Sequence, residues 1–593
     1  MKPVKETVIR DFSDAVRLDN FRIDPDGGLK KREGYSFKSY LDGKVRGAID
    51  DYETTYLVSG YSFYKYADDI LSHIGTLDEA YFDDENEAVS LFIHARNIFI
   101  MGGGALYRYA PDTGSFDSIE GYTPLVIRNS NAALSSYEEY EPLNLISKTV
   151  RCHYNLLSGT TTYYLWGNAS SLKAIYADGA LVRSNYYTAY IQGASSYITF
   201  KTFFYTGQTD LVIEYTLDPS FHSGLTSQLF KGTKASFYEH EGEARMLIYG
   251  GSLKDKVYVS EYSRFDPIDS ITGLHKTTNS KGEECSTIYE IQQSYIKDRF
   301  NYFTKTGFAE VGFDGETVRA VERLSDHYMV FSKSGIYRAE HLDGLNNGKN
   351  LKTSGIKTVL ITDEYGIGQA SGTAVYEDSL YFYNENGLYR YRYNSTTNDF
   401  ISASIPIVDY AAPDRKASDR VSLFLYRRYG ELWCCYDGYA SVYDLKRKRW
   451  SRFSGIDTDL LFCCDSHAAF SKGSCLYVFD ESNYTDGGVG FEAVFESKNY
   501  DLGSKFSTKV LYGFGVCLDR IIGATIEAAV TSDKGVSLAL SYSPNANSSV
   551  SPSVMRSHAR LSSVSFVKCT LVSPADNAPA NVREIMFRYR EMG

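Results

Sequence analysis

The chain has 593 residues, of which 43% are hydrophobic and 15% aromatic, with 51 Tyr but only 3 Trp. This length predicts several domains, and the abundance of Tyr favours strands that have one packed face and one wet face. The net charge of −12 argues against a nucleic-acid-binding face, which needs clustered Lys and Arg, but it permits a wall past which DNA slides.

The N-terminal segment, residues 1–44, contains a hairpin signal. Its first ten residues lack the apolar stretch of a signal peptide, and no run of about 18 apolar residues follows. We therefore expect synthesis in the cytoplasm and no membrane span. Residues 20–35 read as a strand, an Asp-Gly-Gly turn and a second strand with a basic patch.

A pair of strand-like runs joined by a Gly or Ser turn recurs along residues 45–121 and 237–489. The second run of each pair carries a Tyr. These tyrosines are Tyr64, Tyr107, Tyr258, Tyr337, Tyr389, Tyr443 and Tyr477. Most of their separations are close to the roughly 40–50 residues of a four-stranded propeller blade. The pattern predicts an all-β protein built on a β-propeller of about seven blades; the alternative is a series of β-sandwiches with unrelated hairpins.

Two long gaps interrupt this repeat. The first, residues 122–236, contains alternating runs such as Asp210–Thr216 and predicts an inserted β-sandwich. In the second gap, Cys285–Phe300 has apolar residues at helical spacing and a candidate capping box at Thr287 and Glu290, which predicts a helix.

Residues 490–593 are strand-like but lack the Tyr hairpin, and they predict a C-terminal β-sandwich. Val536–Tyr542 and Glu584–Tyr589 alternate between polar and apolar residues. The stretch Ser541–Arg560 between them is rich in Ser, Asn and Pro, and it predicts a long loop.

One dense basic run follows Asp444. Its cations are Lys446, Arg447, Lys448, Arg449 and Arg452. They are candidates for contact with DNA phosphates, with Trp450 stacking on a base, or for an ion-pair contact with a neighbouring subunit. The remaining alternative is an ordinary charged hairpin tip.

No motif in the sequence predicts a catalytic, cofactor-binding or metal-binding residue. The nine Cys have no Cys-x-x-Cys spacing, so we interpret them as small buried hydrophobic residues in a reducing compartment. Three acidic clusters could bind Ca²⁺, but solvated turn residues explain them better, since no EF-hand spacing is present. These clusters are Asp50-Asp51, Asp68-Asp69 and Asp83-Asp84-Glu85.

The segment 20–35 resembles the opening of phage tail and head-completion propeller proteins, the nozzle or tail-tubular class. Those proteins carry Asn…Gly-Leu-x-x-Arg-Pro-Gly-Tyr before the first blade. The matching residues are Asn20, Gly28, Leu29, Arg32, Gly34 and Tyr35, whereas Glu33 replaces the usual Pro. The inserted domain after Leu143-Asn-Leu-Ile and the ending Ile585-x-Phe-x-Tyr589 are similar to the same family.

The resemblance implies a non-enzymatic structural protein of the virion tail. It implies a ring of copies, commonly six, around a DNA exit channel, docked to adjacent tail or adaptor proteins. Two other functions stay open at this stage. One is a tail-tip propeller that binds a receptor or glycan. The other is a propeller glycosidase or lyase, which would need paired carboxylates from different blades.

Overall fold

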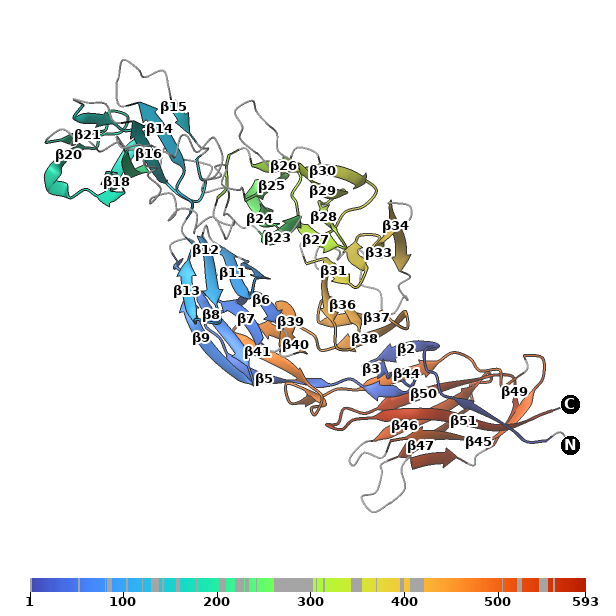
Figure 1. Ribbon diagram of the computed structural model, residues 1–593. Coiled ribbons are helices and arrows are strands. Elements are labelled where there is room, and N and C mark those ends of the chain that lie inside the picture. Colours follow the sequence, from blue (N-terminus) through green and yellow to red (C-terminus); the bar gives the residue numbers. More distant parts are fainter. Residues whose placement is uncertain are drawn as a thin grey trace. The chain divides into compact units, whose positions relative to one another are not determined.

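The computed structural model describes residues 3–51, 54–79, 82, 88–102, 105–119, 121–129, 138–140, 143–155, 160–177, 179–201, 210–218, 229, 234–240, 243–260, 302–305, 307–312, 315–342, 355–369, 371–394, 399–405, 421–464, 466–503, 505–519, 525–542, 553–557 and 560–592. The chain divides into two compact units. Met1–Leu77 and Ile367–Gly593 form the terminal unit, and Asp78–Gly366 form the central unit. The described residues are mainly strands (Figure 1).

Four groups of four antiparallel strands in the terminal unit are propeller blades, numbered here in chain order over both units. Blades 1 and 5 are separate sheets, whereas the strands of blades 6 and 7 belong to larger sheets. Blade 1 is β6 (Val45–Asp51), β7 (Thr54–Ser59), β8 (Ser62–Ala67) and β9 (Ile70–Thr76). Blade 5 is β31 (Thr373–Tyr376), β32 (Ser379–Asn384), β33 (Gly387–Asn394) and β34 (Asp399–Ile405). Blade 6 is β35 (Ser422–Tyr426), β36 (Glu431–Tyr436), β37 (Tyr439–Asp444) and β38 (Arg449–Ser454). Blade 7 is β39 (Leu460–Cys464), β40 (His467–Lys472), β41 (Cys475–Asp480) and β5 (Gly34–Tyr40).

The central unit contains three further blades of the same form. Blade 2 is β10 (Ser90–His94), β11 (Asn97–Gly102), β12 (Ala105–Ala110) and β13 (Ser115–Ser118). Blade 3 is β23 (Lys234–His240), β24 (Glu243–Tyr249), β25 (Lys256–Val259) and β26 (Phe308–Glu310), with the 3-10 helix η5 (Gly251–Leu253) before β25. Blade 4 is β27 (Ala320–Leu324), β28 (His327–Phe331), β29 (Ile336–Leu342) and β30 (Gly355–Thr362).

The seven tyrosines of the sequence repeat lie in the third strands of the seven blades, which confirms the propeller prediction. β36, the second strand of blade 6, shows why inner strands of a blade are apolar on both sides. Its alternating residues face the two neighbouring blades. Leu432 and Cys434 pack with blade 5, whereas Trp433 and Cys435 pack with blade 7.

A separate β-sandwich is inserted in the central unit, as predicted. Its larger sheet runs in the order β15-β14-β16-β22-β18-β19 and its smaller sheet in the order β17-β21-β20, and one apolar cluster joins them. The strands are β14 (Leu125–Asn129), β15 (Glu138–Tyr140), β16 (Thr149–Asn155), β17 (Thr162–Tyr164), β18 (Ala169–Ala177), β19 (Ala180–Leu181), β20 (Tyr187–Tyr190), β21 (Tyr197–Phe200) and β22 (Asp210–Leu217), with the 3-10 helix η3 (Ser184–Tyr186).

The C-terminal β-sandwich combines strands from both ends of the chain. One sheet runs in the order β3-β4-β51-β45-β48, with β1 beside β51 and β49 beside β45. The other continues from β38 of blade 6 through β2, β44, β50, β46 and β47. The strands are β1 (Lys5–Ile9), β2 (Ala15–Asp19), β3 (Phe21–Ile23), β4 (Leu29–Lys31), β44 (Ala493–Ser497), β45 (Lys509–Leu518), β46 (Ile526–Ser532), β47 (Ser537–Tyr542), β48 (Ser553–Ser557), β49 (Leu561–Val564), β50 (Val567–Ser573) and β51 (Asn581–Glu591).

Two sequence expectations about these regions need correction. The segment 1–44 contains the predicted hairpin, since β3 pairs with β4, but it is not a unit of its own. β1–β4 complete the sandwich, and β5 completes blade 7 and pairs with the short β42 (Thr485–Asp486), which pairs with β43 (Val489–Gly490). The stretch Ser541–Arg560 is not only a loop, because β48 lies within it and pairs with β45. The helix predicted at Cys285–Phe300 lies outside the described residues.

Candidate functional site

The segment 20–35 lies within the terminal unit, where blade 6, blade 7 and the sandwich meet. Asn20 follows β2, which lies between β38 of blade 6 and β44 of the sandwich. Gly34 then begins β5, the last strand of blade 7. We call this segment and the side chains that contact it the joint.

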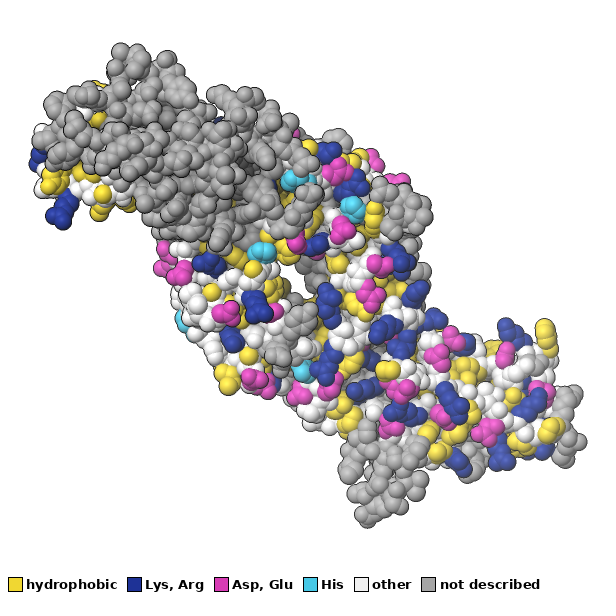
Figure 2. All heavy atoms as spheres, in the orientation of Figure 1, with side chains coloured by type: hydrophobic (Ala, Val, Ile, Leu, Met, Phe, Trp, Pro, Cys, Tyr) yellow, Lys and Arg dark blue, Asp and Glu magenta, His cyan; other side chains and the backbone are white. Residues whose placement is uncertain are grey.

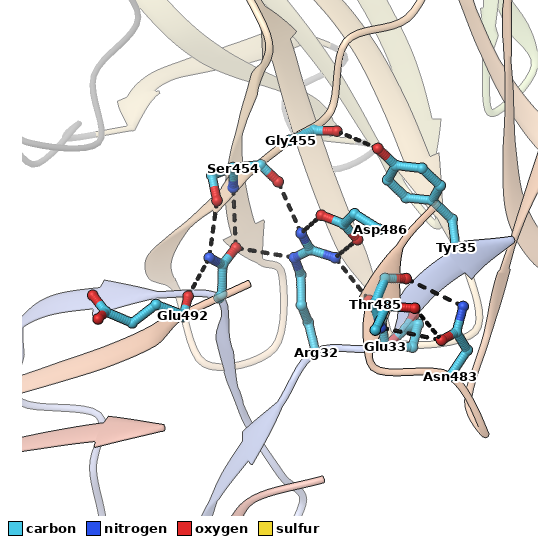
Figure 3. Close-up of polar contacts among 10 residues, drawn as sticks. Arg32, Glu33, Tyr35, Ser454, Gly455, Asn483, Thr485, Asp486 and Glu492 are labelled. Carbon is cyan, nitrogen blue, oxygen red and sulfur yellow. Dashed lines mark hydrogen bonds and ion pairs between the residues drawn. The ribbon is translucent and has the colours of Figure 1, made fainter. Parts of the chain in front are cut away.

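Arg32 is the centre of the joint (Figure 3), and its side chain is 0% exposed. Its Nη1 and Nη2 donate to the two carboxylate oxygens of Asp486 over 2.9 and 2.5 Å. The other three N–H groups donate to the carbonyl oxygens of Glu33 and Ser454 over 2.8 Å each and to Asn20 Oδ1 over 3.0 Å. All five donors of the guanidinium therefore have acceptors, which is what makes this buried cation tolerable.

Asn20 has a backbone φ of +55°, in the left-handed region that Asn tolerates better than most residues. Its Nδ2 donates to Ser454 Oγ over 2.9 Å and to the carbonyl of Glu492 over 2.6 Å. Its Oδ1 accepts from Arg32 and from the backbone N–H of Ser454. Asn20 thus connects blade 6 to the start of the sandwich strand β44.

Glu33, the residue that departs from the family pattern, is buried and forms an ion pair with Arg22. Arg22 Nε also donates to Glu431 of blade 6 over 2.6 Å. Burial opposes the charge on Arg22, but the two carboxylates outweigh it and raise the pKa of Arg22. Burial raises the pKa of Glu431, while Arg22 acts in the opposite direction. Glu33 is accommodated in the interior because Arg22 supplies a cationic partner, which Glu33 shares with Glu431.

Lys31 is a further buried charged residue of the joint. Its Nζ donates over 3.1 Å to the carboxylate of Asp576 and to the carbonyl oxygens of Pro574 and Asp576. Burial lowers the pKa of Lys31, and burial raises the pKa of Asp486 although Arg32 opposes this. The sequence prediction of a basic patch on this strand is therefore wrong, since Lys31 and Arg32 are both fully buried.

The apolar positions of the segment are fixed by close packing. Leu29 is 0% exposed in the sandwich core, and a Cβ on Gly28 would lie 2.9 Å from the carbonyl oxygen of Val582. Tyr35 packs edge-on against Phe470 and Phe479 of blade 7, and its hydroxyl donates to Gly455 O over 3.0 Å. Burial raises the pKa of Tyr35 to about 12, so this hydroxyl keeps its proton at neutral pH.

Gly34 is the tightest position in the joint. A Cβ there would lie 2.1 Å from the carbonyl oxygen of Thr485, which is backbone. We expect Gly34→Ala to lower the free energy of unfolding by about 1–3 kcal/mol because β5 and β42 must separate. Gly355→Ala is the matched control, since no atom lies within 4 Å of a Cβ there. Urea unfolding of the two variants tests this, and equal losses would contradict it.

The predicted basic run forms the tip between β37 and β38. Arg447 donates to Asp444 and, over 2.6 Å, to the carbonyl oxygen of Asp24. Arg449 lies 3.7 Å from Asp14. The run is thus partly engaged within the terminal unit, and Figure 2 shows cations and carboxylates interspersed over this part of the surface.

The other members of the run differ in exposure. Lys446 and Lys448 are exposed, whereas Arg452 is half-buried. The guanidinium of Arg452 lies 4.0 Å from the centre of the Tyr439 ring. Trp450 is buried against Tyr443, so the suggested stacking of Trp450 on a base is wrong. Contact of the cations with DNA or a subunit stays a prediction.

The joint offers hydrogen bonds and ion pairs but no nucleophile beside a base. Across the described part of the chain, no group of three His, Cys, Asp or Glu is placed to hold a metal ion. Asp69 instead pairs with Lys38, and Asp50 accepts a hydrogen bond from Thr55. Asp83, Asp84 and Glu85 lie outside the described residues. The eight described Cys are free, and six are buried.

Sequence reasoning identified the segment but missed its partners. Glu431, Asp486 and Asp576 are more than 400 residues away along the chain. Asp486 and Asp576 lie in polar, turn-like stretches and Glu431 begins an apolar strand, so no local signal marks any of them as the partner of a buried cation. The one hint was the charged run Lys30–Glu33 between Leu29 and the Gly34-Tyr35 pair, since charges that become buried need distant partners.

Neither a family model nor a curated protein matches this chain. Solved structures similar to it include the WD40 domain of Neurospora crassa Pan2, at 8% identity over 74% of this chain and 90% of that one, with a TM-score of 0.24. Another is PorZ of Porphyromonas gingivalis, at 9% identity over 91% and 82%, with a TM-score of 0.20. Because both scores are low, the fold assignment rests on the strand pairing described above.

Proposed function

We propose that the chain is a structural component of a phage virion tail, in a nozzle, hub or neck-proximal ring that borders the DNA exit channel and docks neighbouring tail proteins. One observation carries this proposal. The six residues that match the family's opening segment all lie in the joint, and each has a contact that fits its residue type.

A shared segment of this kind reflects shared architecture. Asn20 supplies a left-handed turn with four hydrogen bonds, Gly34 leaves room for a crossing strand, and Arg32 supplies a five-donor fork. In this chain these three contacts lie where blade 6, blade 7 and the sandwich that both chain ends build meet. This agreement between the matched residues and their contacts supports the proposal that the chain shares the domain arrangement of that family.

The joint suits a protein that must resist mechanical separation of its domains. A chain segment that belongs to blade 7, blade 6 and the sandwich cannot leave one without disturbing the others.

Among the described helices, none is long and apolar enough to cross a membrane. Rings of copies, commonly six in the similar family, and DNA passage through their centre are part of the proposal.

A second candidate function is binding of a receptor or glycan by the inserted domain. Tyr164, Tyr197 and Tyr190 lie opposite one another across β17, β21 and β20. Tyr164 is 51% exposed and Tyr190 43% exposed. A row of Tyr beside Thr residues on an uncharged strand face is typical of surfaces that recognise varied partners.

Electron microscopy and mass photometry of the purified full-length chain test the proposed function. We expect closed rings with a central channel, because the similar family forms rings and head-to-tail contacts close into a ring where the rotation between copies closes. A stable monomer that binds a polysaccharide, and loses this binding in Tyr164→Ala and Tyr190→Ala, would favour the second candidate. A monomer that hydrolyses the polysaccharide would contradict both.

A further inference from the structure

The outer face of one sandwich sheet contains a groove along β45. Gly513 and Gly515 form its floor, because both face outward and neither has a side chain. Met586 and Arg588 of β51 lie on one side, and Arg556 of β48 lies on the other. The cavity has a volume of about 190 Å³. Glycine inside a strand often marks a place where another chain approaches closely.

Arginines surround this groove, which we call the arginine groove. Arg556 and Arg588 line it directly. At its end, Tyr512 lies in a β-bulge, and the guanidinium groups of Arg560 and Arg590 lie 5.4 and 5.5 Å from the centre of its ring. Such contacts hold a cation in place without neutralising it.

The arginines of the groove contrast with other cations of the same sheet. Lys5 pairs with Glu591, Arg10 with Glu584, and Arg583 with Asp519. Within the part of the chain that the structure describes, Arg556, Arg560 and Arg588 form no ion pair. Glu6 lines the groove in register with Arg588, yet it forms no ion pair with described residues either. In a protein of net charge −12, this is a local excess of positive charge.

We propose that the arginine groove is a docking site for an acidic segment of a protein partner, with a carboxylate held between Arg556 and Arg588. Forked guanidinium groups bind carboxylates with two parallel hydrogen bonds. The inference rests on the proposed function, to which it adds a specific docking surface.

The size and composition of the groove favour a protein segment over other anions. Small-molecule sites have volumes of roughly 300–1,000 Å³, so this cavity is too small for such a ligand and suits one or two side chains. Tyr, Met and Arg are enriched at the centres of protein interfaces. Nucleic-acid binding draws on many cations along a backbone, whereas two arginines line this groove directly.

The first experiment measures binding of a fluorescein-labelled peptide rich in Asp and Glu to the full-length protein by fluorescence anisotropy. We expect Arg556→Ala with Arg588→Ala to weaken binding at least tenfold. Arg556→Lys with Arg588→Lys should give an intermediate loss, because the charge remains but the fork is lost. Glu6→Gln should strengthen binding, since it removes the one carboxylate that lines the groove.

The matched control is Arg10→Ala with Arg17→Ala, because both arginines lie on exposed parts of the sandwich and already have ion pairs. It should bind the peptide as the unchanged protein does. Circular dichroism confirms folding of each variant. Single-stranded oligo(dT) of similar length is the competing probe. Tighter binding of oligo(dT) through the same arginines, or no binding of the peptide, would overturn the inference. Rings that form normally in the arginine variants would leave the proposed function intact.

Discussion

Arg32→Met should lower the free energy of unfolding of the terminal unit by about 3–5 kcal/mol, because it removes one partner of a buried ion pair. Without the two N–H donors of Arg32, Asp486 would have to carry an unpaired charge in a buried place or take up a proton, and either costs free energy. The carbonyl oxygen of Ser454 and Oδ1 of Asn20 would each lose a hydrogen bond as well. Guanidinium unfolding followed by Trp fluorescence in a Trp166→Phe background measures this, since the other two Trp lie in blade 6.

Two comparisons make this result specific to the joint. Arg10→Met removes an exposed arginine that pairs with Glu584, and it should cost about 1 kcal/mol at most. Arg32→Met combined with Asp486→Leu should be more stable than Arg32→Met alone, because no unpaired charge remains. If Arg32→Met and Arg10→Met have the same effect, the joint does not hold the sandwich to the blades.

Trp433→Ala should cost about 3–5 kcal/mol, the typical loss for a fully buried Trp. Trp433 is 0% exposed, and four aromatic rings pack edge-on against it at 5.4–5.8 Å. One of these rings, Phe479, belongs to blade 7, so the substitution weakens the contact between two blades. The Nε1 of Trp433 also donates to the carboxylate of Glu431 over 2.9 Å, and in the variant that buried carboxylate would lose a donor.

Thermal unfolding followed by circular dichroism measures the Trp433 variant, because the substitution removes the fluorescent side chain. Trp433→Phe keeps most of the apolar volume and should lose clearly less stability. Tyr439→Ala is a control in the same blade, since Tyr439 is 37% exposed. A Trp433→Ala protein as stable as the Tyr439 variant would contradict the packing described between blades 6 and 7.

The joint shows where prediction from sequence succeeded and where it could not. The segment 20–35 was recognised as a hairpin from its Asp-Gly-Gly turn, and β3 and β4 do pair. The expectation of a basic patch on the second strand was wrong, because Lys31 and Arg32 reach carboxylates of Asp576 and Asp486. No local property of a strand distinguishes a cation in water from a cation with a distant buried partner.

The C-terminal region gives a similar lesson. The alternation of Glu584–Tyr589 predicted a strand, and β51 contains it. The expected loop Ser541–Arg560 contains β48, because pairing with β45 outweighs the weak strand preference of its Ser residues.

By itself, the sequence determined the blades. Turn residues and alternating apolar residues act over a few positions, so seven Tyr hairpins could be read directly and all seven lie in third strands of blades. Only the tertiary structure decided that the N-terminal residues complete blade 7 and the sandwich, and that Arg22, Lys31 and Arg32 are buried there. Their partners are separated by hundreds of residues, and only folding brings the carboxylates and the cations into contact.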